Sequence, residues 1–345
     1  MGMRDRTALV GFSSWFAAIV LLLTLGCHSP LHYIEPFTST CGADSETSAQ
    51  DREAVDRVAL QFVQEALGPN PALAYSAFTT EAKQSLPSEK FLAVFQQVIQ
   101  PRGPFKNLHV EHTYVAKITG SDHGQRVVCG NLSGPEGWVA VSIRPGPEQA
   151  HVIVEGETTN NNWVFVIWLS RERGDWHILY SHFATEKMVG KSAEDLQMMA
   201  QLQHQAHRDF NAYILYAAAL QLADRGPNFQ LGSQPEIQKG IAEVEVPREL
   251  RGQPPFAWSF GKSSFKILNV AALGVSGKIY LLIDHEIEPW VDNQDADRKN
   301  HDLMVNFATA YPEYRDAFAG LVVRAHERGG NRGWGTVDEN ESSAK

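Results

Sequence analysis

The sequence predicts an α+β protein with two modules, each combining helices with an antiparallel sheet. Apolar residues recur every three to four positions over residues 51–99, which is the spacing of amphipathic helices. Over residues 108–183 apolar and polar side chains alternate, which is typical of strands. A second group of alternating segments surrounds one helical segment between residues 265 and 337. Helices followed by a separate run of strands favour the α+β class.

The first 26 residues have the composition of a secretory signal peptide. Two arginines precede an apolar run from Ala8 to Leu25, and a glycine stands before Cys27. A charged start, an apolar middle and a small residue at the cut site predict export. No second apolar stretch of that length follows, so residues 27–345 are expected to be soluble apart from any anchor.

The end of this segment, Thr24-Leu25-Gly26-Cys27, resembles the lipobox of bacterial lipoproteins, although Thr24 and Leu25 depart from its usual order. The resemblance implies that Cys27 takes up fatty acid such as palmitate and becomes the mature N-terminus. It also implies a cell-envelope location, at the outer membrane in a Gram-negative organism, because His28 follows. Two alternatives stay open: an uncleaved signal anchor, since the run of about 18 residues approaches a bilayer span, and cleavage elsewhere.

Residues 27–50 are rich in Ser, Thr and Pro without periodicity, and are expected to be a tether. An oxidising compartment would allow Cys41 and Cys129 to form a disulfide, which would pin this tether to the first domain. The alternative is a buried free thiol at Cys129 and a mobile one at Cys41.

The first domain is expected at residues 51–190. One helix starts near Asp51 and ends at Gly68-Pro69, a second covers residues 71–84, and a third begins at its N-cap Ser88. Turn residues then separate six expected strands, at residues 108–118, 126–130, 138–144, 151–157, 163–170 and 176–183.

This order and spacing resemble the nuclear-transport-factor-2-like fold, a cystatin-like α+β arrangement of helices and a curved antiparallel sheet. The resemblance is carried by the opening helix, Ala74–Phe78, Leu86-Pro87-Ser88 and Gly103–Lys106 before the first strand. It implies a cone whose mouth can hold a small molecule, and pairing into a homodimer. The family includes isomerases, dehydratases and non-enzymatic adaptors, so the fold alone does not decide the function.

Catalytic members of that family place an Asp/His or Tyr/Asp set inside the cone. His109 and His112 have odd spacing on one strand, so they should point to opposite faces and cannot share a metal without a bulge. No Asp stands at a matching position of the central strands, so we predict half-buried side chains and no catalytic residue or metal site. The candidate cone-lining residues are Tyr114, His151, His177, Tyr180 and His182.

Residues 191–248 are expected to form a helical segment, with a long stretch over 192–223 broken near His207 and a short helix over 235–241. His204 and His207 share a helix face, but no third ligand matches, so they are interpreted as surface histidines.

A second small α+β domain is expected at residues 249–338, and no family is recognised there. Asn293, Asp295 and Asp297 alternate like a calcium loop but lack its later Gly and Glu, so residues 292–298 are interpreted as an acidic loop before a helix. Residues 339–345 are expected to be a disordered tail. The expected elements are strands at 265–271, 278–285, 321–325 and 334–337 and a helix at 300–311.

Charge and motifs exclude several function classes. The formal net charge of −10 argues against nucleic-acid binding, which needs a basic surface. The sequence has no phosphate-binding loop, zincin motif or nucleophile elbow, and no cofactor is expected. The expected function is therefore a lipid-anchored, non-enzymatic binding or interaction module, whose partner is an envelope protein or a small molecule. The alternative is a small-molecule-binding or enzymatic cone in the first domain.

Overall fold

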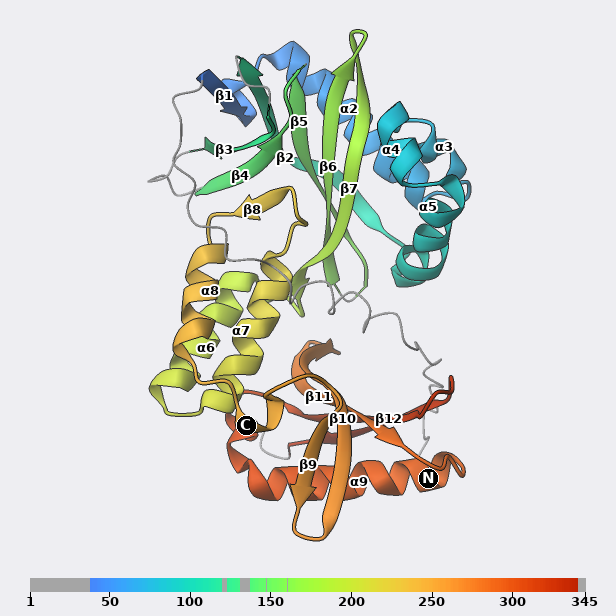
Figure 1. Ribbon diagram of the computed structural model, residues 1–345, viewed down its shortest axis with the longest axis vertical. Coiled ribbons are helices and arrows are strands. Elements are labelled where there is room, and N and C mark those ends of the chain that lie inside the picture. The colour runs from blue at the N-terminus through green and yellow to red at the C-terminus, as the bar shows by residue number, and fades with distance from the viewer. Residues whose placement is uncertain (1–37, 120–122, 131–136, 147, 160, 341–345) are drawn as a thin grey trace. The chain divides into compact units, whose positions relative to one another are not determined.

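The computed structural model describes residues 38–119, 123–130, 137–146, 148–159 and 161–340. The expected signal peptide, its lipidation cysteine and the last five residues of the tail lie outside these ranges. The described chain is of the mixed α+β class, as predicted, and its strands form three sheets (Figure 1).

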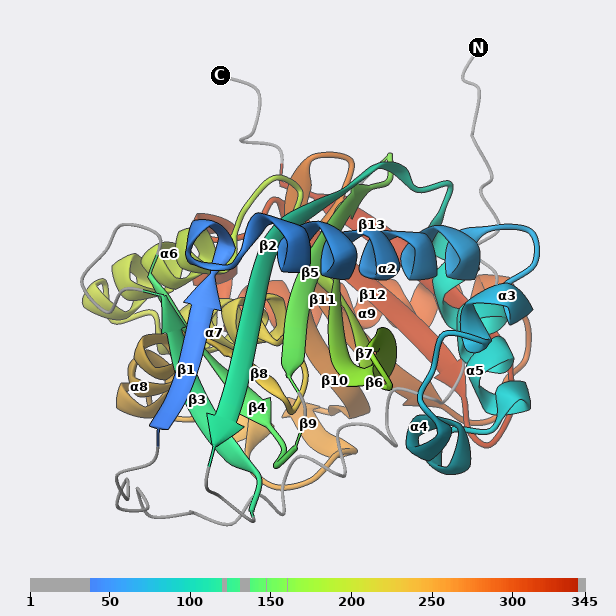
Figure 2. The same cartoon turned by 90° about the horizontal axis from the view of Figure 1, so that it is seen from above.

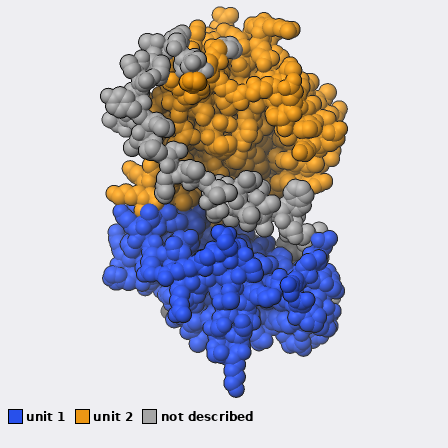
Figure 3. All heavy atoms as spheres, viewed as in Figure 1, with its two compact units in different colours: residues 1–33, 197–218, 240–345 blue, residues 34–196, 219–239 orange. Residues whose placement is uncertain are grey.

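The chain divides into two compact units, coloured separately in Figure 3. Unit 2 contains residues 34–196 and 219–239, and the described part of unit 1 contains residues 197–218 and 240–340. The expected helical segment at 191–248 is therefore not a separate body, because its helices are shared between the units.

Three helices contain the boundaries between the units. They are α6 (Ala193–Gln205), α7 (Asp209–Ala223) and α8 (Gln234–Glu243). The break near His207 is where the sequence predicted it, and His207 itself has a positive φ of 58°. A residue in this left-handed conformation cannot continue a right-handed helix.

The main sheet of unit 2 is antiparallel, with strand order β1-β2-β5-β6-β7. Arg173 and Gly174 both have positive φ and turn β6 into β7, as a two-residue hairpin requires. The strands are β1 (Thr38–Ala43), β2 (Lys106–Thr119), β5 (Gln149–Glu157), β6 (Asn161–Glu172) and β7 (Asp175–Met188). The expected tether therefore ends earlier than predicted, because β1 pairs with β2 instead of remaining irregular.

A smaller antiparallel sheet lies against the main one. Its order is β3-β4-β8, with bounds Gln125–Gly130, Trp138–Ile143 and Phe229–Leu231. The pairing of β8 with β4 holds the segment after α7 in unit 2. This three-residue strand was not predicted, because it is too short to show alternation.

Four helices of unit 2 lie between β1 and β2 in the chain. They are α2 (Ala49–Leu67), α3 (Ala72–Tyr75), α4 (Thr80–Ser85) and α5 (Ser88–Val94), which continues as a π turn over Phe95–Ile99. The single helix expected at 71–84 is wrong. The chain leaves α3 to pair with β7, where the Ile178 N–H donates to the Ala77 carbonyl and Thr79 N–H donates back to Ile178. Thr79 then caps α4 by accepting the Ala82 N–H at 3.0 Å.

The two faces of the main sheet are buried against different partners. One face packs against α2 to α5, and Figure 2 shows α2 lying across β2 and β5. The other face packs against the small sheet through residues such as Ile153, Val166, Val141 and Phe229. Because both faces are covered, the alternation of each strand decides which cluster a side chain joins.

Unit 1 contains a five-stranded sheet of order β13-β12-β11-β10-β9 and the helix α9 (Asn293–Ala310). β11 is central, as its two apolar faces predicted, and it pairs in parallel with β12. The acidic loop expected at 292–298 is wrong, because Asp292 caps α9 by accepting the Asp295 N–H, so the helix starts seven residues earlier than predicted. The strands are β9 (Phe256–Phe260), β10 (Ser263–Val275), β11 (Lys278–Ile287), β12 (Gly320–Glu327) and β13 (Gly333–Glu339).

Candidate functional site

The space between the helices and the main sheet of unit 2 is filled by hydrocarbon. Phe62, Phe91 and Phe165 are at most 2% exposed and Ile167 is fully buried. Phe62 meets the ring of Phe78 edge to face at 5.3 Å between centroids. This cluster is apolar throughout, so the side of the sheet that would line an open cone is a packed core.

The five predicted cone residues lie on the opposite side of the sheet. On β5, Val152 and Val154 face the helices, so His151 points the other way. On β7, Ile178 faces the helices, and His177 therefore does not. Tyr114 joins the second core and lies 5.7 Å from the ring of Phe229. The prediction that these five residues line a cone between helices and sheet is therefore wrong. The sequence pattern along a strand does not show which of its two faces the helices cover.

His151 is completely buried in the second core. Its ring stacks on Trp168 at 5.2 Å, and its Nε2 donates to the Ser142 carbonyl at 2.8 Å. Its Nδ1 is buried without a hydrogen-bond partner. Burial lowers the pKa of His151 to about 4, although the Ser142 carbonyl favours the charged form. A neutral imidazole in this position is part of the core.

Tyr180 and His182 lie farther along β7, beside the loop after α7. A Cβ at Gly226 would lie 2.8 Å from the His182 ring, so only glycine allows this loop to approach so closely. Burial lowers the pKa of His182, opposed by the nearby Asp224 carboxylate. Burial and the charge of Asp224 raise the pKa of Tyr180. These two candidates thus share one charged neighbour that the sequence did not indicate.

Arg225 is the most deeply buried charge of unit 2 among the described residues, with 7% of its surface exposed. Its Nη1 donates to the carbonyls of Leu222 at 2.5 Å and Asp224 at 3.2 Å. Burial lowers the pKa of Arg225, whereas the carboxylates of Glu186 and Glu155 favour its charged form. We call Glu155, His182, Glu186, Asp224 and Arg225 the charged cluster of unit 2. Glu155 and His182 of this cluster lie on the same face of the main sheet as the apolar second core.

One group at the margin of this cluster has metal-ligating side chains. His109, Glu111 and Glu155 place one ligand atom each within 4.8 Å of the others. A register shift in β2 between Val110 and His112 leaves Glu111 at a bulge. The sequence predicted that His109 and His112 point to opposite faces without a bulge, and this bulge instead places both on the face of Ile153 and Glu155. The cross-strand neighbour Glu155 could not be found without the register.

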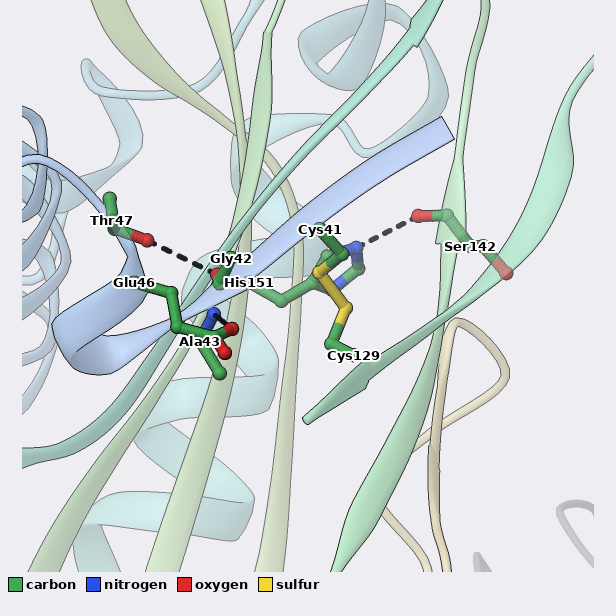
Figure 4. Close-up of a disulfide and its surroundings, with 8 residues drawn as sticks. All are labelled: Cys41, Gly42, Ala43, Glu46, Thr47, Cys129, Ser142 and His151. Carbon is green, nitrogen blue, oxygen red and sulfur yellow. Dashed lines mark hydrogen bonds between the residues drawn. A yellow bond between two sulfur atoms is a disulfide. The ribbon is translucent and has the colours of Figure 1, made fainter. Parts of the chain in front are cut away.

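Cys41 and Cys129, which the sequence left open between a disulfide and free thiols, are joined in the structure. Their Cα atoms lie 5.3 Å apart, and the bond links β1 to β3 (Figure 4). The close-up also shows His151 behind the disulfide, with its bond to Ser142. The first described strand is thus held by backbone pairing to β2 and covalently to the small sheet.

Unit 1 has a buried polar group that the sequence did not single out. Asp284 is 6% exposed and accepts two hydrogen bonds from Arg324, at 2.6 and 2.8 Å, and one from His326 at 3.1 Å. Burial alone would raise its pKa, but the bonds from His326 and Arg324 lower the pKa of Asp284 to about 2. The group is saturated with internal partners, which indicates a structural role.

Two sequence patterns that resembled metal sites, at His204 and at Asp295, form hydrogen bonds and ion pairs with nearby residues. His204 Nδ1 lies 2.7 Å from Asp209 Oδ1, across the break between α6 and α7. Asp295 forms ion pairs with Arg298 at 2.6 Å and Lys299 at 2.8 Å in the first turns of α9. Both arrangements are ordinary helix-end contacts.

Comparison with family models, with curated proteins and with solved structures gave no match for this chain. Among the described residues, no helix combines the length and the apolar character needed to cross a bilayer.

Proposed function

We propose that this chain is an exported, lipid-anchored protein of a bacterial envelope, acting as a non-enzymatic binding or interaction module. The anchor would be fatty acid on Cys27, at the end of the signal-like segment. Two attached acyl chains would give stable membrane binding, because each buried CH₂ contributes about 0.8 kcal/mol. The formal net charge of −10 does not favour adsorption of the chain to anionic lipid.

The disulfide is the observation that supports export. A structural disulfide persists in oxidising compartments and is rare in the cytosol. The Cys41–Cys129 bond also suits a tethered protein, since it fixes the strand that follows the tether to the folded unit.

The packed interior of unit 2 is the observation that carries the non-enzymatic part of the proposal. Small-molecule sites are usually open cavities of about 300 Å³ or more with converging polar groups. The centre of the helix-facing side of this sheet is instead filled by buried aromatic and aliphatic side chains. The order of helices and antiparallel strands supports a nuclear-transport-factor-2-like arrangement for unit 2, here used as a solid module.

Metabolic labelling tests the anchor. Bacteria expressing the full chain are grown with an alkyne-bearing palmitate analogue, and the protein is examined for label and for its membrane fraction. The intact chain should be labelled and sediment with membranes, whereas Cys27→Ser should lose both properties. Cys41→Ser is the matched control and should retain the label. An unlabelled chain that stays in the cytosol with residues 1–26 attached would contradict the proposal.

A small-molecule function is the second candidate, favoured by the shared environment of Tyr180, His182 and Asp224. Native mass spectrometry of the purified chain separates the two. A stoichiometric organic molecule that is lost in His182→Gln would favour the second candidate. The bare chain mass, together with capture of an envelope protein by cross-linking, would favour the first.

A further inference from the structure

A histidine and two glutamates converge on the main sheet of unit 2, on the side facing away from the helices. His109 and Glu111 are two residues apart on β2, and although the bulge at Glu111 interrupts the alternation, His109 Nε2 lies 3.2 Å from Glu111 Oε2. The antiparallel register places His109 opposite Glu155 of β5. One nitrogen and two carboxylate oxygens lie within 4.8 Å of one another.

The hydrogen bond at the other ring nitrogen fixes the orientation of His109. Its Nδ1 lies 2.8 Å from the Asn107 carbonyl, which can only accept, so Nδ1 carries a proton. In neutral imidazole, Nε2 is then an acceptor, and it lies 3.2 Å from Glu111 Oε2, which also only accepts. At this distance the two atoms are bridged either by a proton, in an imidazolium–carboxylate ion pair, or by a metal ion. A backbone carbonyl holding the second N–H is the usual support of a metal-binding histidine.

The carboxylates around this point repel one another. Glu111 and Glu155 each bring one carboxylate oxygen to within 4.8 Å of the other. Glu186 Oε2 is buried without a hydrogen-bond partner and lies 3.8 Å from the Lys187 ammonium. Two carboxylates and one imidazole thus converge on one point, where a bound cation would offset the repulsion between the carboxylates.

We propose that His109, Glu111 and Glu155 bind one divalent transition-metal ion of the zinc type. The imidazole nitrogen favours zinc over calcium or magnesium, which prefer oxygen ligands. Zinc bonds of about 2.0–2.2 Å in tetrahedral geometry separate ligand atoms by about 3.3–3.5 Å, close to the 3.2 Å between His109 and Glu111. The exposed Glu111 side chain can rotate to shorten the longer separations. The site does not depend on the lipid anchor.

Zinc titration calorimetry tests the site. The full chain is purified in detergent, treated with EDTA and dialysed, and ZnCl₂ is then titrated at neutral pH. The expected result is one equivalent bound, with affinity reduced at least about tenfold in His109→Gln and in Glu111→Gln. Cobalt gives a second readout, because tetrahedral Co²⁺ absorbs strongly in the visible range, and both variants should lose that absorption.

The matched control is His301→Gln on α9, where an exposed histidine lies 3.7 Å from Asp297 without a third ligand. This variant should bind zinc like the parent chain. Far-ultraviolet circular dichroism of each metal-free variant establishes that the fold is retained, and Glu111 is exposed enough to be replaced without disturbing the core. The proposal is overturned if the parent chain binds no zinc, if His301→Gln weakens binding as much as His109→Gln, or if Glu111→Gln leaves the affinity unchanged.

Discussion

The two faces of the main sheet of unit 2 are both buried, yet they differ in chemistry. The centre of the face toward α2 to α5 is apolar and includes the rings of Phe62, Phe91 and Phe165, and its polar contacts with α2, such as the bond from Thr113 to Asp56, are paired within the fold. The face toward the small sheet begins with an apolar core and the neutral His151, and ends in the charged cluster around Arg225. An apolar face stabilises the fold, whereas a face that keeps buried charges near solvent retains the groups that can bind a ligand. The difference directs the search for function to the second face.

Removing an aromatic ring from the helix-facing core should have the largest effect. Phe62→Ala is expected to lower the free energy of unfolding by about 3–5 kcal/mol, because it leaves a cavity among rings that cannot collapse. Urea unfolding followed by tryptophan fluorescence measures the change. Leu73→Ala, at a side chain that is 55% exposed, is the control and should change the value by less than about 0.5 kcal/mol. A loss below about 1 kcal/mol in Phe62→Ala would mean that this face is not the tight core described above.

Breaking the disulfide should have the next largest effect. The double variant Cys41→Ser with Cys129→Ser is expected to lose about 2–4 kcal/mol, since the cross-link restricts a long loop of the unfolded chain. The same unfolding experiment measures it, and parent chain unfolded with a reducing agent should match the double variant. Equal stability of oxidised and reduced chains would show that β1 is held by backbone pairing alone.

Acid should weaken the second face through His151. Burial depresses the folded-state pKa to about 4, below the unfolded value of about 6.5, so the folded state binds fewer protons between these values. This contribution is therefore complete above pH 6.5 and is lost as the pH falls, by up to about 1.4 kcal/mol per pH unit. By pH 5 the loss should approach about 2 kcal/mol. Unfolding curves at pH 7 and pH 5 test this, and His151→Phe should show a smaller drop; an identical drop would assign the acid sensitivity to other groups.

The smallest expected effect on stability is the coupling free energy between two residues of the charged cluster. A double-mutant cycle with Arg225→Gln and Glu186→Gln is expected to show a coupling free energy of about 1 kcal/mol, because each charge offsets the other where water is largely excluded. Urea unfolding of the four proteins gives this value. Pairing Arg225→Gln with the exposed Glu81→Gln gives the control cycle, which should be additive. Additivity in both cycles would mean that solvent already screens the cluster.

Local sequence signals predicted most of the strands. The segments that became β2, β5, β6 and β7 alternate clearly, and each was expected within a few residues of its observed bounds. The elements that the sequence did not predict have physical causes. The strands β1, β8 and β9 are short edge strands, and their pairing depends on partners far away in the chain. The helix expected at 71–84 is interrupted because this segment pairs with Ile178. The start of α9 was predicted too late, because the acidic residues at 292–298 were interpreted as a loop, whereas Asp292 caps the helix there.

The candidate site was only partly accessible to sequence reasoning. His151 and His182 were predicted to line a cone, but they lie on the face of the sheet that the helices do not cover. Glu155, Glu186 and Arg225 were not selected, because no spacing along the chain relates residues from β5, β7 and the end of α7.

The sequence by itself determined the α+β class, most of the helices and strands and the export-like first segment, because these depend on composition and on periodicity within a few residues. Only the tertiary structure decided which face of the main sheet became the packed core, that Cys41 meets Cys129, and that His109 lies opposite Glu155. The physical reason is that strand register and sheet packing join residues far apart in the chain, and a shift of one residue would turn each of these side chains to the other face.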